Sequence, residues 1–411
     1  MKNEFLTRDE CTAMRGIAIL AIMLHNYCHF IGKIVQENEY QFFTSHNEGL
    51  WQVITHPDEL LPVHLLSYFG HYGVPVFLFL SGFGLVMKYE VSPQPSPKGE
   101  GVQTLWRVGD FIRYHYLKLL RMLIVGFTLF IIVDMMTPGR FQYHWDHVIA
   151  QLLMYINVLP EPDKIIWPGI YWFFGLMIEL YIVYRLLLYR QKNWVVIAVV
   201  IVCWLLQVCC DPDGDTLNRL RYNFIGGMLP FGAGILVGRS IDKFHFSMSR
   251  WLWACMTLLT SLLVFVMCFH FQSWLWIPLL IIIGTIALVK TMPQKLLHLC
   301  VWFGSTVLAQ RTDEDVGWVD GVGQPRSFLV VEIGQREGDV DGLFGEGDVE
   351  TDFERLPRLC GLFCGLPFLE EGGERVGVEH FSRTFFQCGD AAVAFQEFFG
   401  EARLPSRPYR C

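Results

Sequence analysis

The segment AMRGIAILAIMLHNYCHFIG, residues 13–32, decides the fold class. Its centre, residues 16–24, contains no polar side chain. The whole segment is close to the ~20 apolar residues that a helix needs to cross a bilayer. Arg15 precedes the apolar centre, and His25, Asn26 and His29 follow it. We therefore predict a first membrane-spanning helix that carries four polar groups.

The composition of the whole chain is that of a multi-pass membrane protein. Of its 411 residues, 53% are hydrophobic and only 18% are charged, which excludes an ordinary soluble enzyme. We predict an all-α integral membrane bundle of about 8 to 10 transmembrane helices. Residues 147–158 are too short to cross and are predicted to be re-entrant or interfacial. After the first segment, the candidate spans are residues 62–87, 118–136, 169–188, 194–210, 222–239, 251–270 and 273–290.

The distribution of Lys and Arg predicts the orientation of the bundle. With a cytoplasmic N-terminus, 17 of these residues fall on the inner side of the spans and 5 on the outer side. This is the asymmetry expected of a multi-pass protein of the cytoplasmic (inner) membrane. The first apolar segment lacks a following cleavage site, so we expect it to stay in the protein as a span.

The composition changes abruptly after Ser305. Residues 1–305 carry a net charge of +2, whereas residues 306–411 carry −10 and contain no stretch long enough to span. We predict a transmembrane domain over 1–305 and a poorly ordered Gly- and acid-rich tail over 306–411. Residues 296–309 begin a ninth apolar stretch that breaks off. Either it is a peripheral helix or the reading frame has shifted, and the altered residue usage favours a frameshift over a native acidic domain.

Helical geometry places the polar groups of the first span together. At 100° per residue, Arg15, His25, Asn26 and His29 fall within an arc of about 100°, with Arg15 about 15 Å from His25 along the axis. An interfacial anchor would explain Arg15, and an interhelical hydrogen bond would explain His25. Ionisable residues on one face of a span are also candidates for a functional site. His25 and His29 have metal-ligand spacing, but no acid on this helix adds a third ligand, so no metal site is predicted.

Four motifs make the chain resemble one known family. Arginine followed ten residues later by histidine, in MRGIAILAIMLH, is similar to the signature of the acyltransferase-3 family, multi-pass membrane enzymes that O-acylate carbohydrates. GVPVFLFLSGFGLVMKY (residues 73–89) resembles the Ser-Gly-Phe span of that family, and YWFFGLMIELYIVY (residues 171–184) resembles its Trp, Glu-Leu, Tyr span. FIRYHYLKLLRML (residues 111–123) resembles the basic start of its third span. The resemblance covers residues 9–305, and family members usually have ten spans.

The resemblance implies transfer of an acyl group, most often acetyl from acetyl-CoA, to a hydroxyl of a cell-surface carbohydrate. The expected partners are membrane lipid, an acyl-CoA co-substrate and a carbohydrate or lipid-linked glycan acceptor, with no bound cofactor and no nucleic acid. His25 is the candidate general base, because imidazole titrates near neutral pH. Arg15 and Glu179 are the other candidate catalytic residues. Glu179 would orient His25 or bind the sugar, or else it is a structural carboxylate.

The remaining site predictions concern the two substrates. Arg113, Lys118 and Arg121 are predicted to bind the CoA phosphates, although the charge asymmetry of the membrane alone would also explain them. The candidate acceptor-binding residues are Ser81, Trp172, His29 and Asn26. Close helix packing beside Gly82 is the alternative for Ser81, and an interfacial aromatic belt is the alternative for Trp172.

Two other functions fit the same polar groups. A transporter or flippase of glycan-related substrates would also bury Arg, His and Glu inside a bundle, but the chain shows no internal repeat of the kind common in transporters. An inactive, truncated family remnant would follow from the break in composition near residue 305.

Overall fold

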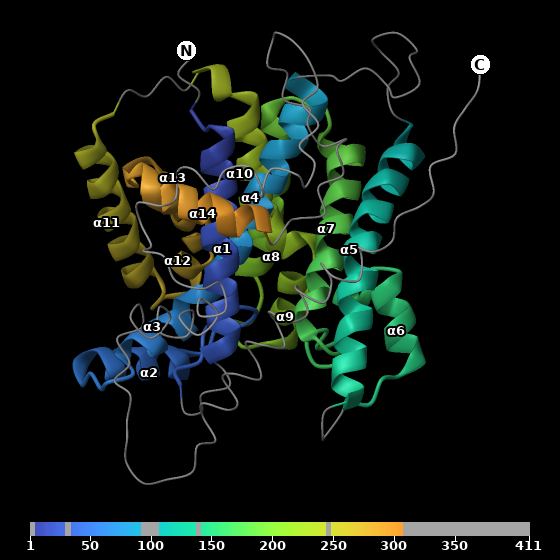
Figure 1. Ribbon diagram of the computed structural model, residues 1–411, viewed down its shortest axis with the longest axis horizontal. Coiled ribbons are helices and arrows are strands. Elements are labelled where there is room, and N and C mark those ends of the chain that lie inside the picture. Colours follow the sequence, from blue (N-terminus) through green and yellow to red (C-terminus); the bar gives the residue numbers. More distant parts are fainter. Residues whose placement is uncertain (1–4, 29–33, 92–106, 137–140, 244–247, 307–411) are drawn as a thin grey trace, which may run out of the picture.

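The computed structural model describes residues 5–28, 34–91, 107–136, 141–243 and 248–306 (Figure 1). The described residues are helical and contain no β-strand, so the predicted fold class is confirmed. Of the predicted tail, residues 306–411, Thr306 is the last residue of a helix, and residues 307–411 lie outside the described residues. In chain order the α-helices are α1 (Arg8–Cys28), α2 (Thr44–Thr55), α3 (Leu61–Phe69), α4 (Gly73–Val86), α5 (Val108–Met136), α6 (Trp145–Leu152), α7 (Trp172–Val183), α8 (Asn193–Val208), α9 (Asp215–Tyr222), α10 (Phe224–Arg239), α11 (Arg250–Met267), α12 (Phe271–Trp274), α13 (Ile277–Thr291) and α14 (Gln294–Thr306).

Each of the eight predicted spans coincides with an apolar helix. Five helical stretches are long and apolar enough to cross a membrane, namely Arg8–Cys28, Leu61–Val91, Val108–Met136, Gly169–Leu188 and Arg250–Met267. Shorter apolar helices occupy the other three positions, Asn193–Val208, Phe224–Arg239 and Ile277–Thr291. The chain is therefore a multi-pass helical membrane protein.

Two helices begin at other residues than the predicted spans. Helix α5 begins at Val108, whereas the span was predicted from residue 118. The span predicted over residues 222–239 corresponds to helix α10, which starts at Phe224. Asn223 caps this helix, because its side chain accepts a hydrogen bond from Ile225 N at 3.1 Å. The preceding residues form the separate helix α9.

Helices α8 and α11 present apolar side chains to the outside of the bundle. Leu258 and Val266 of α11 are 73% and 55% exposed, and Ile201 and Val202 of α8 are also exposed. A row of such residues on a helix of this length is stable only in contact with lipid.

Helices α4 and α10 form the closest pair in the centre of the bundle. A Cβ on Gly82 would collide with the backbone carbonyl of Phe231, and a Cβ on Gly234 would collide with that of Phe79. These glycines therefore let the two backbones touch, which is how membrane helices gain packing energy without a hydrophobic driving force. This supports the packing interpretation of the Ser-Gly-Phe motif.

Helix α14 crosses α1 and packs against it (Figure 1). At the crossing, a Cβ on Gly16 would meet the Cys300 carbonyl, and a Cβ on Gly304 would meet the Thr12 carbonyl. Helix α14 has 13 residues, and at 1.5 Å per residue it is about 20 Å long, shorter than the ~30 Å hydrocarbon layer. The described part of the stretch predicted at residues 296–309, which ends at Thr306, is thus a helix bound to the first span.

A buried ion pair joins three helical segments at one end of the bundle. Arg239, the last residue of α10, donates through Nε to Glu90 Oε2 at 2.7 Å and through Nη2 to Glu90 Oε1 at 2.9 Å. Glu90 lies in the π-helical turn Met87–Val91 that follows α4, and it also accepts from the Tyr184 hydroxyl at 3.0 Å. In the sequence analysis Arg239 is one of the inner-side basic residues. In the structure it forms an ion pair with Glu90.

The opposite end of the bundle is covered by short helices. The carboxyl end of α1 lies there together with α2 and α3, in the lower part of Figure 1. Residues 34–43 run between α1 and α2, and their chain is held by Ser67 Oγ, which donates to Val35 O at 3.0 Å. This loop brings acidic residues against the end of α1.

Candidate functional site

His25 lies in the last turn of α1 and is only 4% exposed. Its Nδ1 lies 2.6 Å from the carbonyl oxygen of Ser67 in α3. Because a carbonyl can only accept, Nδ1 carries the ring proton and Nε2 is the unprotonated nitrogen when the ring is neutral. The bundle thus holds the imidazole in the tautomer that can take up a proton at Nε2.

Gly70 allows the chain after α3 to approach His25. A Cβ on this residue would lie 2.6 Å from the His25 Cβ and 2.8 Å from the Ala21 carbonyl oxygen. No real side chain tolerates such contacts, so only glycine fits between the turn Gly70–Tyr72 and α1. The His25 ring is therefore fixed from two sides, by a hydrogen bond and by backbone packing.

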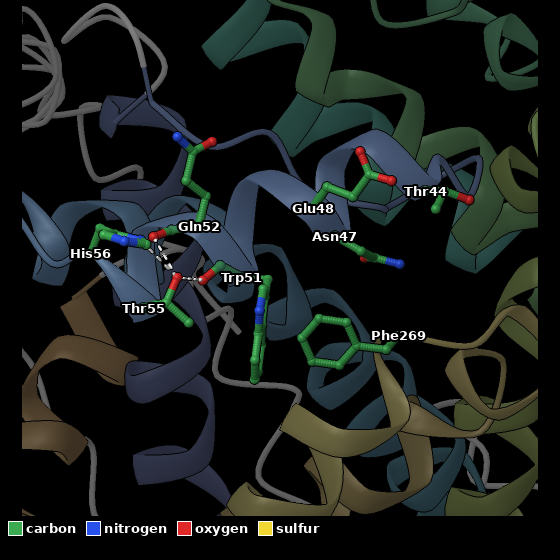
Figure 2. Close-up of a pocket in the computed structure, with 8 residues that line it drawn as sticks. All are labelled: Thr44, Asn47, Glu48, Trp51, Gln52, Thr55, His56 and Phe269. Atoms are coloured by element: carbon green, nitrogen blue, oxygen red, sulfur yellow. Dashed lines mark hydrogen bonds between the residues drawn. The ribbon is translucent and has the colours of Figure 1, made fainter.

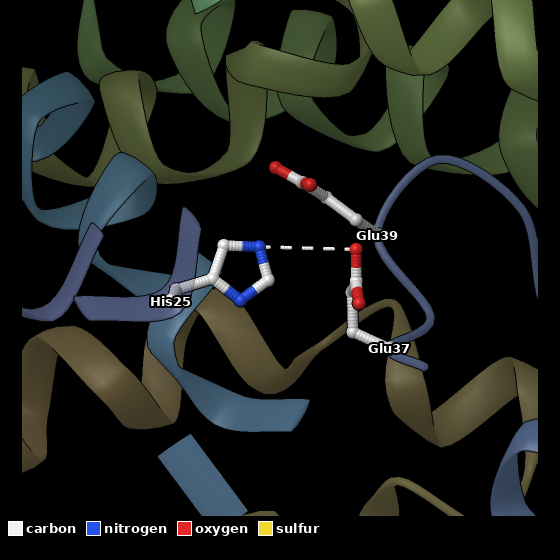
Figure 3. Close-up of side chains that lie close together, drawn as sticks. All are labelled: His25, Glu37 and Glu39. Atoms are coloured by element: carbon white, nitrogen blue, oxygen red, sulfur yellow. Dashed lines mark ion pairs between the residues drawn. The ribbon is translucent and has the colours of Figure 1, made fainter. Parts of the chain in front are cut away.

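Two acidic side chains from the loop, Glu37 and Glu39, lie beside the His25 ring (Figure 3). Glu37 Oε1 lies 3.8 Å from His25 Nε2. One ligand atom from each of His25, Glu37 and Glu39 can be chosen so that all lie within 4.8 Å of one another. The 3.8 Å separation is too long for a direct hydrogen bond. A hydroxyl oxygen placed beside Nε2 would thus be close to a base and to two acidic groups.

The Glu39 carboxyl is expected to hold a proton at neutral pH. Burial, reinforced by the nearby Glu37 carboxylate, raises the pKa of Glu39 from 4.5 to about 8. The backbone beside it is fixed by Arg221, whose Nε donates to the Glu39 carbonyl at 3.1 Å. A protonated Glu39 can donate one hydrogen bond to an oxygen in the site.

An aromatic cluster covers the loop next to the two carboxyl groups. Tyr40 stacks on Tyr222 with ring centroids 3.8 Å apart. Trp172, the first residue of α7, meets both rings edge-on, at 5.4 Å from Tyr40 and 5.1 Å from Tyr222. Trp172 is buried and contacts Tyr40, the residue after Glu39. Its role in acceptor binding stays a prediction.

The trio of His25, Glu37 and Glu39 also has the chemistry of a metal site. Imidazole nitrogen and carboxylate oxygen are ligands of Zn²⁺ and related divalent ions, and a metal-binding histidine usually donates its other N–H to a carbonyl, as His25 does. The sequence analysis predicts no metal site, because no acidic residue on the helix of His25 provides a third ligand. The carboxylates come instead from the loop, and their position beside His25 follows from the fold.

The other predicted polar groups of α1 occupy different positions. Arg15 is partly buried and lies ten residues from His25 in the same unbroken helix, about 15 Å away along the axis. The Asn26 amide donates to the Ile22 carbonyl of its own helix at 2.9 Å. His29 lies outside the described residues. The structure therefore brings His25 together with loop carboxylates, whereas Arg15 lies half a membrane away.

Glu179 binds a helix end. Its Oε2 accepts from the backbone N–H of Phe224, the first residue of α10, at 2.8 Å. A carboxylate at that place pairs with an otherwise unsatisfied N–H and with the positive end of the helix dipole. This contact favours the structural alternative for Glu179, and Glu37 takes the place beside His25. Ser81 is partly buried on α4, next to the Gly82 contact with α10.

Arg113, Lys118 and Arg121 lie on the exposed side of α5. The buried side of this helix consists of Phe111, His115, Leu119, Leu123 and Phe127. Helix α5 packs against α7, whereas α1 packs against α3, α4, α13 and α14. The three basic residues therefore lie at the surface of the bundle, on the face of α5 opposite to the one that packs inward.

Comparison with known proteins gives one match. A family described as an acyltransferase domain matches residues 9–313. No curated protein and no solved structure matches the chain. The match begins before the Arg15 and His25 motif, ends just beyond the change in composition, and includes all the described helices except the first residue of α1, Arg8. Because it covers far more than half of the 411 residues, the chain belongs to the acyltransferase-3 family and is a membrane acyltransferase.

Proposed function

We propose that this protein transfers an acyl group, preferentially acetyl from acetyl-CoA, to a hydroxyl of a cell-surface carbohydrate, with His25 as the general base. The observation that carries the proposal is the hydrogen bond from His25 Nδ1 to the Ser67 carbonyl, 2.6 Å long, which leaves Nε2 unprotonated in the neutral ring, 3.8 Å from Glu37 Oε1. A buried base of this kind suits the deprotonation of an alcohol near neutral pH.

The reaction follows from the positions of these groups. The acceptor hydroxyl gives its proton to His25 Nε2 as its oxygen attacks the thioester carbonyl carbon. A carbon–oxygen bond forms, the carbon–sulfur bond breaks, and the imidazolium returns the proton to the leaving CoA thiolate. While charged, the ring is held between the Ser67 carbonyl and the Glu37 carboxylate, which lies 3.8 Å from Nε2. The protonated Glu39 donates a hydrogen bond to an oxygen of the reacting groups.

The other predicted site residues have supporting roles in this proposal. Arg15, Arg113, Lys118 and Arg121 attract the phosphates of acyl-CoA on the cytoplasmic side, since guanidinium and ammonium groups pair with phosphate. Trp172, Asn26, Ser81 and His29 contact the acceptor glycan. The protein acts in the cytoplasmic membrane with its N-terminus in the cytoplasm, as the excess of inner-side Lys and Arg supports.

The test is acyl transfer in membranes that contain the full chain. His25→Gln keeps a polar side chain without a base, and we expect it to lower the rate by about 10²-fold or more. Glu37→Gln should lower the rate by about tenfold, because it removes the charge that stabilises the imidazolium. The measurement is transfer of labelled acetyl from acetyl-CoA to surface glycan, with equal membrane insertion of each variant.

The control is His298→Gln, because His298 is an exposed histidine of α14. This variant should transfer acetyl groups like the wild type. Unchanged transfer by His25→Gln would remove His25 from the role of base. Absence of transfer in the wild type would instead favour an inactive family remnant.

A further inference from the structure

A hollow of about 570 Å³ lies between α2 and the turn that joins α11 to α12 (Figure 2). It is outside the cluster of His25, Glu37 and Glu39, and no predicted site residue lines it. Its volume is within the range of about 300–1,000 Å³ typical of small-molecule sites. Thr44, Asn47, Glu48, Trp51 and Gln52 lie along one stripe of α2 and form one wall, and Phe269 closes the opposite side.

Two aromatic rings form the apolar part of the hollow. The Trp51 side chain is 54% exposed, and its ring meets Phe269 edge-on with centroids 6.0 Å apart. Phe269 therefore holds Trp51 in place, with the rest of the indole surface open. An exposed, fixed indole gives a flat apolar surface against which the C–H face of a sugar ring can stack.

A buried amide group in the hollow has an unused donor. Asn47 is only 4% exposed, and its Oδ1 accepts from Asn38 Nδ2 at 2.9 Å and from the Tyr68 hydroxyl. Its Nδ2 is buried and has no hydrogen-bond partner among the described residues. In Figure 2 this nitrogen lies on the side of the hollow between Thr44 and Phe269. An unsatisfied buried donor is unfavourable, and an oxygen of a bound ligand would satisfy it.

The charge of the hollow disfavours phosphates. Glu48 is the acidic residue of the lining, and none of the described lining residues is Lys or Arg. A phospholipid headgroup or the phosphates of CoA would be repelled there. Exposed amide, carboxylate and hydroxyl groups of Gln52, Glu48 and Thr44 suit the hydroxyls of an uncharged polyol instead.

The hollow and the candidate active site share one loop. Asn47 binds Asn38, the residue after Glu37, and His46 Nδ1 lies 2.8 Å from the Glu37 carbonyl oxygen. The polar stripe of α2 therefore lies directly behind the segment that places Glu37 beside His25. A sugar bound in the hollow would therefore contact the helix that holds this loop segment.

We propose that this hollow binds a neutral pyranose unit of the acceptor glycan, stacked on Trp51 and hydrogen-bonded to Asn47 Nδ2. That the sugar is the acceptor rests on the proposed function, but its binding does not require acyl transfer. The site is a glycan subsite separate from the general base.

The experiment measures binding by saturation-transfer difference NMR with the purified full chain in nanodiscs and without acyl-CoA. The probes are maltose, cellobiose and N,N′-diacetylchitobiose, and glycerol 3-phosphate represents a lipid headgroup. We expect at least one disaccharide to bind. Trp51→Leu should weaken its binding by about tenfold or more, whereas Trp51→Phe, which keeps an aromatic face, should stay within about threefold of the wild type.

The matched control is Trp145→Leu, which removes the 81% exposed Trp145 of α6 without touching the hollow. It should bind the disaccharide like the wild type. The proposal is overturned if no disaccharide binds the folded wild type or if Trp51→Leu binds the disaccharide as tightly as the wild type. It is also overturned if Trp145→Leu weakens disaccharide binding as much as Trp51→Leu does. Glycerol 3-phosphate bound in a Trp51-dependent way would reassign the hollow to lipid headgroups. Each of these results leaves the acyl-transfer test of His25 unaffected, so the two proposals can fail separately.

Discussion

At the scale of single residues, the structure gives His25 neighbours that its own helix does not provide. His25 could be identified from the sequence because an ionisable side chain inside an apolar segment is energetically costly and is therefore a candidate for a functional site. It did not identify Glu37 and Glu39, which lie in the loop that follows. Their closeness to His25 depends on how this loop returns to the bundle, through contacts with Ser67, Asn47 and Arg221 that are distant in sequence. The available signal was the group of acids in VQENEY directly after the first span.

The raised pKa of Glu39 predicts how stability depends on pH. The folded protein holds this proton up to about pH 8, whereas the unfolded chain loses it near 4.5. Between these values the folded state binds more protons, so this group makes the free energy of unfolding fall as the pH rises. Glu39→Gln removes the effect. We expect it to melt several degrees above the wild type at pH 8 and close to the wild type below pH 4.5.

The measurement is thermal unfolding in detergent at several pH values. Glu59→Gln, which changes an exposed glutamate, is the control and should follow the wild-type curve. If the difference in melting temperature between the wild type and Glu39→Gln stayed constant from pH 4.5 to 8, the assigned ionisation of Glu39 would be contradicted.

At the scale of helices, hydropathy predicted the position of every apolar helix but not how the helices pair. All eight predicted segments correspond to apolar helices because bilayer thickness fixes the length of an apolar run. Pairing depends on small residues at contact points, and a glycine in the sequence does not reveal its partner. Gly82 and Gly84 look equivalent in the Ser-Gly-Phe-Gly motif, yet only Gly82 touches another helix.

This difference predicts that two similar substitutions change the stability by different amounts. Gly82→Val would force a side chain into the Phe231 carbonyl, whereas a Cβ on Gly84 has nothing within 4 Å. We expect Gly82→Val to separate α4 from α10 and lower stability by about 1–3 kcal/mol, as other overpacked sites do. Gly84→Val should change stability little. Melting temperature and yield of folded protein in detergent measure both, and equal effects would contradict the α4–α10 contact.

At the scale of the whole molecule, the bundle has two distinct ends. One end contains the buried Arg239–Glu90 pair, and the other contains the loop carboxylates, α2 and the end of α1. The sequence predicted which end faces the cytoplasm from its 17 to 5 distribution of Lys and Arg. It could not predict that one of those arginines is paired inside the protein, because charge counts carry no information on tertiary contacts.

The predicted orientation can be tested by labelling introduced cysteines in intact cells. Ser45 on α2 and Lys192 before α8 are both exposed and lie on opposite sides of the predicted membrane. With Cys209 and Cys255, the exposed cysteines among the described residues, replaced by Ser, a membrane-impermeant maleimide should label Ser45→Cys directly. It should label Lys192→Cys only after the cells are permeabilised. The reverse labelling pattern would contradict the predicted orientation, because it would place the N-terminus outside the cell and the His25 end of α1 at the cytoplasmic side.

The crossing of α1 and α14 has a consequence for biosynthesis. Gly16 is among the first residues made, and its contact Gly304 belongs to the last described helix. At a synthesis rate of about 5–20 residues per second, roughly 15–60 s separate the two. During this time the helix that carries His25 sits in the membrane with its Gly16 face open to lipid or to the insertion machinery. The nascent enzyme therefore completes the surroundings of α1 only when α14 arrives.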